Sequence, residues 1–399
     1  MQRGSFQWMK SLNKAIILNK IRTSEPISRA QIAKETKLTP PTVGSIVKEL
    51  LEQRLILEST LGESQGGRKP TMLILNTSGF HVIGSDVGLS KIQFIISDLS
   101  GKVMDESEEL LDENVTEESF LSILTKGVQH LMQQHSDLEF IGIGVAMHGI
   151  VDAESGVSIF APNLQLRDIP IKKDLEEKFQ MDVKVENDAK AFALGEAWFQ
   201  DRVSHKSMVA INIGLGVGAG IVIDGKLYNG EHGIAGEIGH MMIDINGKKC
   251  SCGNYGCLQT LVSGPAIAER ILEQLNYGNE SILINWIEEE QAITAELVYK
   301  AAMNNDSLAI EILHDTGVYI GIALTNLVHV WNPSKIIIGG GVSKAGDFIL
   351  TAIKETLMER VITEKAQTTA ILISKLGSYG SSLGSVALIL SELFEPNIG

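Results

Sequence analysis

The apolar residues of the N-terminal segment recur at helical spacing in consecutive runs. In residues 12–21 they fall largely on one helical face, at Leu12, Ala15, Ile16, Leu18 and Ile21. Residues 25–38 predict a second, short helix, for which Ser28 is the N-cap candidate. The inward positions of this second helix are expected to be Ile32, Ala33 and Leu38.

A third run, residues 39–56, predicts a longer helix directly after the second. Thr39 can cap it, prolines fit its first turn, and its apolar stripe consists of Val43, Ile46, Val47, Leu50 and Leu51. A short helix, a turn and a longer helix form a helix-turn-helix, whose second helix reads DNA bases from its N-terminal residues. The outward side chains that we expect to contact DNA there are Thr42, Ser45 and Lys48. A protein-binding or dimerising module is the alternative interpretation.

Residues 55–76 contain two strand-like runs around a glycine-rich tip, which predicts a β-wing beside the helices. The tip reads GGRKP (66–70), and Arg68 and Lys69 place two cations on it. We expect Arg68 to enter a narrow A·T-rich minor groove, where the potential is most negative. A solvated turn is the alternative interpretation of this tip.

After residue 80, apolar strands close on glycine turns and lead into helices. Residues 81–104 predict a strand, a tight turn and a second strand, and residues 208–230 repeat this arrangement. Further buried strands are expected within 140–152, 183–199 and 334–343. Two similar beginnings predict a duplicated α/β body with a cleft between its halves.

The charge of the chain divides in the same place as its pattern. Residues 1–72 contain 12 Lys and Arg and 6 Asp and Glu, a net +6, so the chain total of −15 leaves −21 on the remainder. This asymmetry indicates a basic nucleic-acid-binding segment joined to an acidic body. The chain begins without an apolar signal-peptide region and has no long uninterrupted apolar run, so we expect a cytoplasmic protein with no membrane partner.

All three cysteines of the chain, Cys250, Cys252 and Cys257, lie in the segment KKCSCGNYGCLQ (248–259). Their clustering does not resemble a disulfide framework, and sulfur ligands favour zinc. A closed zinc site usually takes four ligands, and His232 and His240 are both candidates for the fourth. Three unliganded thiols are the alternative. A DNA-binding zinc finger is disfavoured, because no second histidine follows at finger spacing.

Three further motifs accompany the cysteines: APNL (161–164), ENDAKAFALGE (186–196) and AGEIGH (235–240). With these motifs the chain from residue 81 resembles the ROK family of repressors and sugar kinases. The resemblance implies a two-lobed α/β body with the actin and hexokinase fold, which is ribonuclease H-like. The helix-turn-helix is similar to that of the family's xylose and N-acetylglucosamine repressors. The family pattern around the cysteines implies His240, Cys250, Cys252 and Cys257 as ligands of a structural zinc.

The resemblance also implies which residues contact sugar hydroxyls: Asn163, Asn187, Asp188, Glu237 and His240. One ring nitrogen of His240 can bind zinc while the other donates to the sugar. The family often has Glu after Gly-Cys-Leu, and Gln259 at this position is expected to bind the sugar with a different preference. Taken singly, Asn187-Asp188 also fits a helix N-cap, and Glu237 a solvated turn.

In the family's kinases the residue that matches Asp188 is the general base of phosphoryl transfer, so Asp188 could serve the same role here. The kinases read Asp-x-Gly-Gly-Thr at the first phosphate turn, where this chain has DVGLSK (86–91), with Leu89 replacing the second glycine. At the second turn Gly-Thr-Gly has become Gly214-Leu215-Gly216. Both changes remove features that bind a nucleotide, so we expect no enzymatic activity. A hexose kinase with an N-terminal regulatory domain is the alternative.

The sequence therefore predicts a sugar-responsive transcriptional repressor of carbohydrate-utilisation genes. Its expected parts are a winged helix-turn-helix (1–76), a first lobe (81–187 with about 378–399) and a second lobe with the zinc site (188–377). We expect a homodimer or a dimer of dimers that binds operator DNA and a small sugar inducer. A regulator controlled by a partner protein is a third interpretation.

Overall fold

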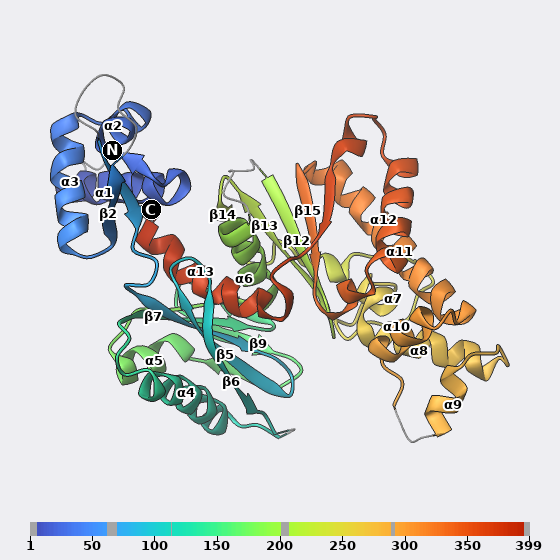
Figure 1. The fold of residues 1–399 in the computed structure, drawn as a ribbon. Helices are drawn as coiled ribbons and strands as arrows, with labels where there is room; N and C mark the ends of the chain where they lie inside the picture. The colour runs from blue at the N-terminus through green and yellow to red at the C-terminus, as the bar shows by residue number, and fades with distance from the viewer. Residues whose placement is uncertain (1–5, 62–69, 113, 201–206, 289–291, 395–399) are drawn as a thin grey trace. The chain divides into compact units, whose positions relative to one another are not determined.

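The computed structural model describes residues 6–61, 70–112, 114–200, 207–288 and 292–394. Its chain divides into two compact units (Figure 1). The first unit comprises Met1–Asp188 and Ser382–Gly399, and the second comprises Ala189–Ser381. The chain therefore crosses between the units twice.

The first unit begins with a module of three helices and a small antiparallel sheet, drawn in blue in Figure 1. Its elements are α1 (Phe6–Ser24), β1 (Ile27–Ser28), α2 (Arg29–Thr36), α3 (Pro40–Glu52), β2 (Ile56–Leu61) and β3 (Thr71–Leu75). The strand order is β1-β3-β2, and β2 with β3 forms the predicted wing hairpin. The tip residues Arg68 and Lys69 lie outside the described residues.

Local signals in the sequence determine where the helices of this module begin. Ser28 caps α2 in a capping box with Gln31, and the Thr39 hydroxyl accepts a hydrogen bond from the Thr42 backbone N–H at the start of α3. Both predicted N-caps are confirmed. The prediction for Ile16 was wrong: Ile16 is 38% exposed, whereas Ile17 is fully buried. The two side chains point about 100° apart on a helix, so the buried face of α1 is rotated toward Ile17.

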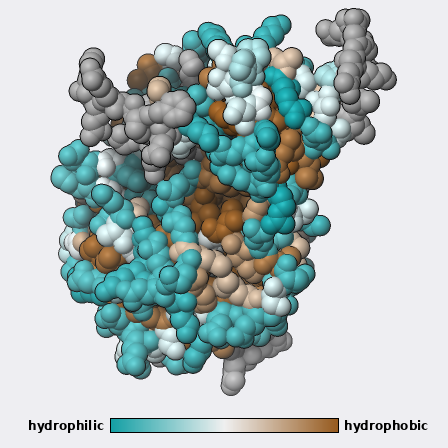
Figure 2. Space-filling model, turned by 90° about the vertical axis from the view of Figure 1, so that its left-hand side faces the viewer, coloured by the Kyte–Doolittle hydropathy of each residue, from teal (hydrophilic) through white to brown (hydrophobic). Residues whose placement is uncertain are grey.

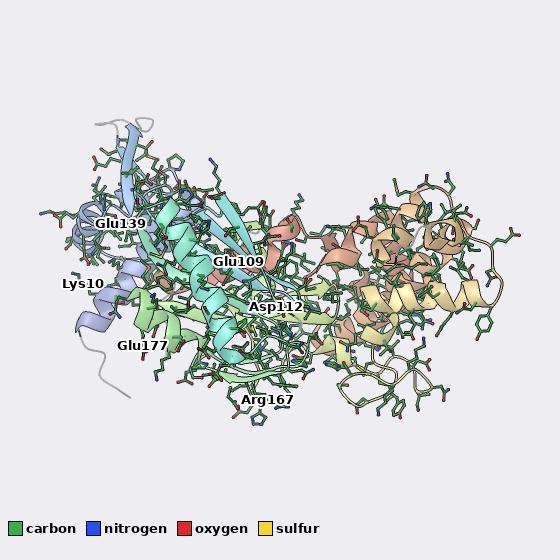
Figure 3. The ribbon with its side chains drawn as sticks, turned by 90° about the horizontal axis from the view of Figure 1, so that it is seen from below. Lys10, Glu109, Asp112, Glu139, Arg167 and Glu177 are labelled. Carbon is green, nitrogen blue, oxygen red and sulfur yellow. The ribbon has the colours of Figure 1, made fainter. Side chains whose placement is uncertain are left out.

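The module is joined to the rest of the first unit by side-chain contacts around Arg54. The Arg54 guanidinium forms an ion pair with Glu139, which is labelled in Figure 3, and lies 5.9 Å from the centre of the Phe80 ring. The backbone carbonyl of Arg54 accepts a hydrogen bond of 2.7 Å from the Asn76 side chain. These contacts hold the turn between α3 and β2 against the start of the body.

The body of the first unit is a five-stranded sheet with the order β11-β7-β4-β5-β6. Its strands are β4 (His81–Val87), β5 (Lys91–Asp98), β6 (Val103–Leu110), β7 (Phe140–Met147) and β11 (Val183–Asn187). Strand β4 pairs antiparallel with β5 and parallel with β7. The helices of this unit's body are α4 (Glu117–Gln134), α5 (Ile171–Phe179) and α13 (Gly380–Phe394).

Helix α13 approaches the sheet very closely. A Cβ atom on Gly144 in β7 would lie 1.9 Å from the Ser385 carbonyl oxygen of α13, so no larger residue fits. At the other end of α13, Arg22 of α1 lies over the Phe394 ring at 5.7 Å. One helix thus contacts both the central sheet and the N-terminal module.

The sequence pattern did not predict a small third sheet in this unit. It has the order β10-β9-β8 and consists of β8 (Ile150–Asp152), β9 (Val157–Ala161) and β10 (Leu166–Ile169). Its strands have three to five residues, which is too short for a clear alternation of apolar and polar positions. Asn163 lies in the loop between β9 and β10.

The second unit is built on another five-stranded sheet, with the order β14-β13-β12-β15-β16. Its strands are β12 (Ser207–Ile213), β13 (Val217–Ile223), β14 (Lys226–Leu227), β15 (Lys335–Gly339) and β16 (Ala370–Ile373). Strand β12 pairs antiparallel with β13 and parallel with β15, as β4 does with β5 and β7. The predicted duplication and the mixed α/β fold class are confirmed.

Helices surround this second sheet. They are α6 (Asp188–Gly195), which continues as the π-helix η1 (Glu196–Gln200), then α7 (Gln259–Val262), α8 (Gly264–Asn276), α9 (Leu283–Glu288), α10 (Ala295–Met303), α11 (Ser307–Trp331) and α12 (Asp347–Arg360). Short 3₁₀ turns lie at Ile238–His240, Gly341–Ala345, Ala366–Thr368 and Gly377–Tyr379. Helix α6 lies close to β13, because a Cβ on Gly220 would be 2.4 Å from the Ala193 side chain.

Helix α11 is the longest helix of the described chain and packs along α12. By length and apolar composition it is the one described helix that could cross a membrane, yet 61% of its apolar stretch is buried inside the second unit. Its burial is that of a core helix, and residues such as Ile312, Ile320 and Leu324 belong to the main apolar cluster of this unit.

Candidate metal centre and polar site

The three cysteines lie on a loop that leaves the short helix Ile238–His240 and ends at α7. Two isolated bridges, Met242 with Cys257 and Lys249 with Tyr255, fold the loop back on itself. Gly256 has a φ of +65°, and a Cβ atom there would lie 1.6 Å from the Asp244 carbonyl oxygen. The glycine before Cys257 is therefore required for the turn that brings the cysteines together.

The loop gathers four side chains at one point: His240, Cys250, Cys252 and Cys257, whose ligand atoms all lie within 4.8 Å of one another. The His240 Nδ1 atom is 3.6 Å from the Cys250 sulfur, and the Cys252 and Cys257 sulfurs are 3.7 Å apart. His232 is exposed and does not belong to this group.

These distances fit a tetrahedral metal ion. Zinc bonds of about 2.3 Å to sulfur and about 2.0 Å to nitrogen, at the tetrahedral angle, separate two sulfurs by about 3.8 Å and a sulfur from a nitrogen by about 3.5 Å. The observed separations are close to both values. The described residues thus contain a cluster that could bind a metal through one nitrogen and three sulfurs.

The charges of the thiols also fit a cation. Burial raises the pKa of Cys250, but hydrogen bonds from Cys252, His240 and Cys257 outweigh burial and bring this pKa to about 6. Burial raises the pKa of Cys257 as well, and the neighbouring Cys252 and Cys250 raise it further, to about 12. The group therefore ionises one thiol easily and resists further negative charge, which a bound divalent cation would stabilise.

The two ring nitrogens of His240 face different neighbours. Nδ1 faces the Cys250 sulfur, while Nε2 lies 3.9 Å from a carboxylate oxygen of Glu237. At 3.9 Å the carboxylate is too far for a direct hydrogen bond to Nε2, so this nitrogen is not committed to Glu237. Glu237 and His240 are thus neighbours in the second unit, as the motif AGEIGH implied.

Lys190 is a residue of this region that sequence reasoning missed. It lies on α6, is only 4% exposed, and its ammonium donates a hydrogen bond of 2.5 Å to the Gly233 carbonyl oxygen. Gly233 precedes the AGEIGH motif, so Lys190 fixes the segment that leads to Glu237. The signal was a lysine within the apolar helix ENDAKAFALGE, because a buried lysine needs a specific partner.

The first unit holds a second group of polar side chains, at the ends of β4 and β11. The Asn187 side-chain amide donates to the Gly149 carbonyl at 2.9 Å and to the Asp188 carboxylate at 3.0 Å. Burial raises the pKa of Asp86, and the charge of Asp188 raises it further, to about 7. Two carboxylates therefore lie near each other at this end of the sheet, whereas Asn163 is exposed on its loop.

The residues expected to read DNA are on α3. Ser45 and Lys48 are exposed, and the Lys48 side chain is 79% exposed and forms a long ion pair with Glu52 at 3.8 Å. The Thr42 hydroxyl is 2.8 Å from that of Thr39, so it also takes part in the helix cap.

Hydrophilic side chains dominate the face shown in Figure 2, and the acidic residues Asp112 and Glu177 of the first unit are exposed (Figure 3).

Comparison with known proteins places these features in a family. Residues 82–392 match the model of the ROK family. The chain belongs to the ROK family. The resemblance read from its motifs is confirmed.

Curated relatives match along almost the whole chain. A xylose repressor of Caldicellulosiruptor bescii is 32% identical over 98% of each chain. The xylose repressor of Bacillus subtilis is 31% identical over 97% of each chain. The DNA-binding transcriptional dual regulator NagC of Escherichia coli is 31% identical over 97% of this chain and 94% of its own.

Solved ROK structures differ in how much of this chain they match. A ROK transcriptional regulator described as a homologue of E. coli Mlc has a TM-score of 0.86 and 29% identity, and covers 97% of both chains. A ROK glucokinase of Streptomyces griseus in complex with glucose and AMPPNP has a TM-score of 0.69 and 27% identity, and covers 98% of its own chain but 77% of this one.

Proposed function

We propose that this protein is a sugar-responsive, DNA-binding transcriptional repressor of carbohydrate-utilisation genes. The observation that carries the proposal is the share of this chain that each known protein matches. The regulator structure and the repressor relatives match nearly all of both chains, whereas the glucokinase leaves 23% of this chain unmatched. A chain that joins a winged helix module to a ROK body has the parts that a sugar-controlled repressor needs.

The N-terminal module supplies the DNA contacts in this proposal. Ser45 and Thr42 on α3 face base edges, and Lys48 binds phosphate. On the wing Arg68 enters the minor groove, and Lys69 is a second cation that contacts the DNA. A homodimer or a dimer of dimers presents two such modules to a two-fold symmetric operator. The exposure of Ser45 and Lys48 on one side of a capped helix supports this assignment.

The polar residues of the body bind the sugar in this proposal. The residues assigned to the sugar are Asn163, Asn187, Asp188, Glu237 and His240. Carboxylates accept hydrogen bonds from sugar hydroxyls, and asparagine amides both donate and accept. The sugar controls DNA binding only if its affinity differs between the DNA-bound and the free protein.

We also propose that the metal of the second unit is a structural zinc held by His240, Cys250, Cys252 and Cys257. One nitrogen and three sulfurs at tetrahedral separations are the donor set that zinc prefers. When bound, the ion cross-links the loop to the short helix that carries His240. Glu237 lies three residues before His240, so the same cross-link orients a residue assigned to the sugar.

Catalysis of phosphoryl transfer is the weaker alternative, although Asp188 could act as its base. Such catalysis depends on positioned phosphate contacts. At the second glycine turn Leu215 is 63% exposed, so an apolar side chain stands where the family's kinases offer a hydroxyl. Leu89 adds a side chain to the first turn. The proposal is therefore a regulator without enzymatic activity that acts in the cytoplasm.

The domain limits of the proposal are a DNA-binding module of residues 1–76, a first lobe of 81–187 with about 378–399, and a second lobe of 188–377.

Control by a partner protein is a separate hypothesis, and measurements of sugar binding distinguish it from control by a sugar. Calorimetry with a panel of pentoses, hexoses and N-acetylated hexosamines should identify a sugar that binds. Binding of none of them, with intact DNA binding, would favour the partner hypothesis.

A further inference from the structure

Gln259 makes an unusual contact for a residue that its motif assigns to a sugar. It is the first residue of α7, directly after the cysteine loop. Its side-chain Nε2 atom lies 3.1 Å from the Cys250 sulfur and 3.2 Å from the Ser251 hydroxyl. The sulfur is shielded from water, because Cys250 is only 4% exposed.

We propose that Gln259 is a positioning residue of the metal centre, which holds the Cys250 thiolate through an N–H···S hydrogen bond. This inference rests on the proposed zinc site. It assigns the donor end of Gln259 to a metal ligand rather than to the sugar. The side-chain oxygen points elsewhere, toward the turn at Gly216.

An amide donor at this position suits the charge of the cluster. Three thiolates and a neutral imidazole around a divalent cation leave one net negative charge. An amide N–H stabilises this charge on the sulfur, and groups that orient metal ligands in this way typically change metal affinity 10- to 100-fold. An ionised glutamate, which the family often carries here, has only acceptor oxygens and cannot donate to the sulfur, so this contact depends on the amide of Gln259.

The backbone of Gln259 is fixed well enough for this role. The preceding Leu258 N–H donates to the Met241 carbonyl at 2.9 Å, and the Gln259 carbonyl accepts from the Ser263 N–H at 3.3 Å. The nearby Lys248 cannot replace the amide, because its ammonium pairs with Glu269 and Glu273 at 3.1 and 2.5 Å. Among the described residues, two side-chain nitrogens contact the Cys250 sulfur: the amide nitrogen of Gln259 and the Nδ1 atom of His240.

The test is the metal affinity of the full chain without sugar or DNA. Zinc affinity is measured by competition with a chromophoric chelator, and Co²⁺ in place of zinc reports the sulfur ligands by its charge-transfer absorption. Gln259→Glu is expected to weaken zinc binding about 10- to 100-fold and to shift the charge-transfer band. Gln259→Met keeps the size of the side chain, lacks the N–H, and should weaken binding to a smaller extent.

The matched control is Gln274→Glu on α8. It introduces the same charge in the same unit, but Gln274 accepts its hydrogen bond from Asn279 and a carboxylate accepts it equally well. This control should leave zinc affinity unchanged, and circular dichroism checks that each variant folds. Zinc affinity of both Gln259 variants within two-fold of the wild type would overturn the proposal, above all if their sugar affinity fell instead. A wild-type chain that binds neither Zn²⁺ nor Co²⁺ would overturn the metal site itself.

Discussion

The two units share one sheet topology but carry different chemistry. In each unit a central strand pairs antiparallel with the next strand and parallel with a later one, giving the orders β11-β7-β4-β5-β6 and β16-β15-β12-β13-β14. At the ends of β4 and β11 the first unit has two carboxylates and an amide, those of Asp86, Asp188 and Asn187. The second unit places sulfur and nitrogen ligands on a loop beside its sheet.

The difference arises from the segments inserted between equivalent strands. Between β6 and β7 the first unit has one helix, α4, whereas between β14 and β15 the second unit has the cysteine loop and the helices α7 to α11. The metal ligands of the second unit therefore lie on an insertion, whereas Asp86 and Asn187 of the first unit lie at the ends of strands β4 and β11 themselves. One repeated sheet thus supports two kinds of site, one built from strand ends and one built from a loop.

The largest expected effect breaks the metal site of the second unit alone. His240→Ala removes one of four ligands and should lower zinc affinity by more than about 100-fold, and lower sugar affinity with it. Zinc content by atomic emission and sugar binding by calorimetry check both. His232→Ala is the matched control, because His232 is exposed and outside the cluster. Normal zinc and sugar binding in His240→Ala would contradict the coupling of metal and sugar.

A substitution in the first unit should affect the sugar without affecting the metal. Asp188→Asn keeps the shape of the side chain but replaces a charged acceptor, and hydrogen bonds to charged groups contribute about 1.5–3 kcal/mol. We expect sugar affinity to fall by about 10- to 150-fold. Zinc content should stay at the wild-type level. Calorimetry that shows unchanged sugar affinity would remove Asp188 from the site.

The DNA-reading helix offers a smaller, matched test. Lys48→Ala should weaken operator binding several-fold for all sequences alike and reduce the slope of log K against log salt by about 0.9. Lys173→Ala on α5 is the control. Both lysines are exposed, at 79% and 72%, and both pair with a glutamate four residues later. Equal effects of the two variants would exclude a phosphate contact by Lys48.

The smallest expected effect concerns pH and the first unit. The pKa of Asp86 is raised to about 7, mainly by burial and further by Asp188. The folded state therefore binds a proton more tightly than the unfolded state, so the cost of the ionised carboxylate is present above pH 7 and is lost as the pH falls toward 4. Asp86→Asn should raise the unfolding temperature by a few degrees at pH 8 and by less at pH 5. Calorimetry that finds the same shift at both values would contradict the raised pKa.

Features that depend on neighbouring residues could be predicted from the sequence. The caps at Ser28 and Thr39 and the stripe of α3 follow from local hydrogen bonds and helical periodicity. The duplicated strands were visible because each combines apolar residues with a glycine turn. Ile16 was misplaced, because adjacent isoleucines at 16 and 17 leave the centre of the buried face ambiguous.

Features that depend on distant residues could not be predicted in this way. The strands β8 to β10 are short and form a sheet of their own, with β9 paired to both β8 and β10. The contact of Lys190 with Gly233 joins residues 43 positions apart. For Gln259 the motif indicated a sugar ligand, but only the folded loop reveals that its amide meets the Cys250 sulfur.

The most direct test of a sugar-controlled repressor follows DNA binding and ATP together. Fluorescence anisotropy measures binding of the full chain to a DNA fragment that it selects from genomic DNA, while sugars are added in the presence of ATP. The account predicts that one sugar changes the DNA affinity by at least about five-fold and that no ATP is consumed. Sugar-dependent consumption of ATP that disappears in Asp188→Asn, with DNA affinity unchanged by every sugar, would contradict it.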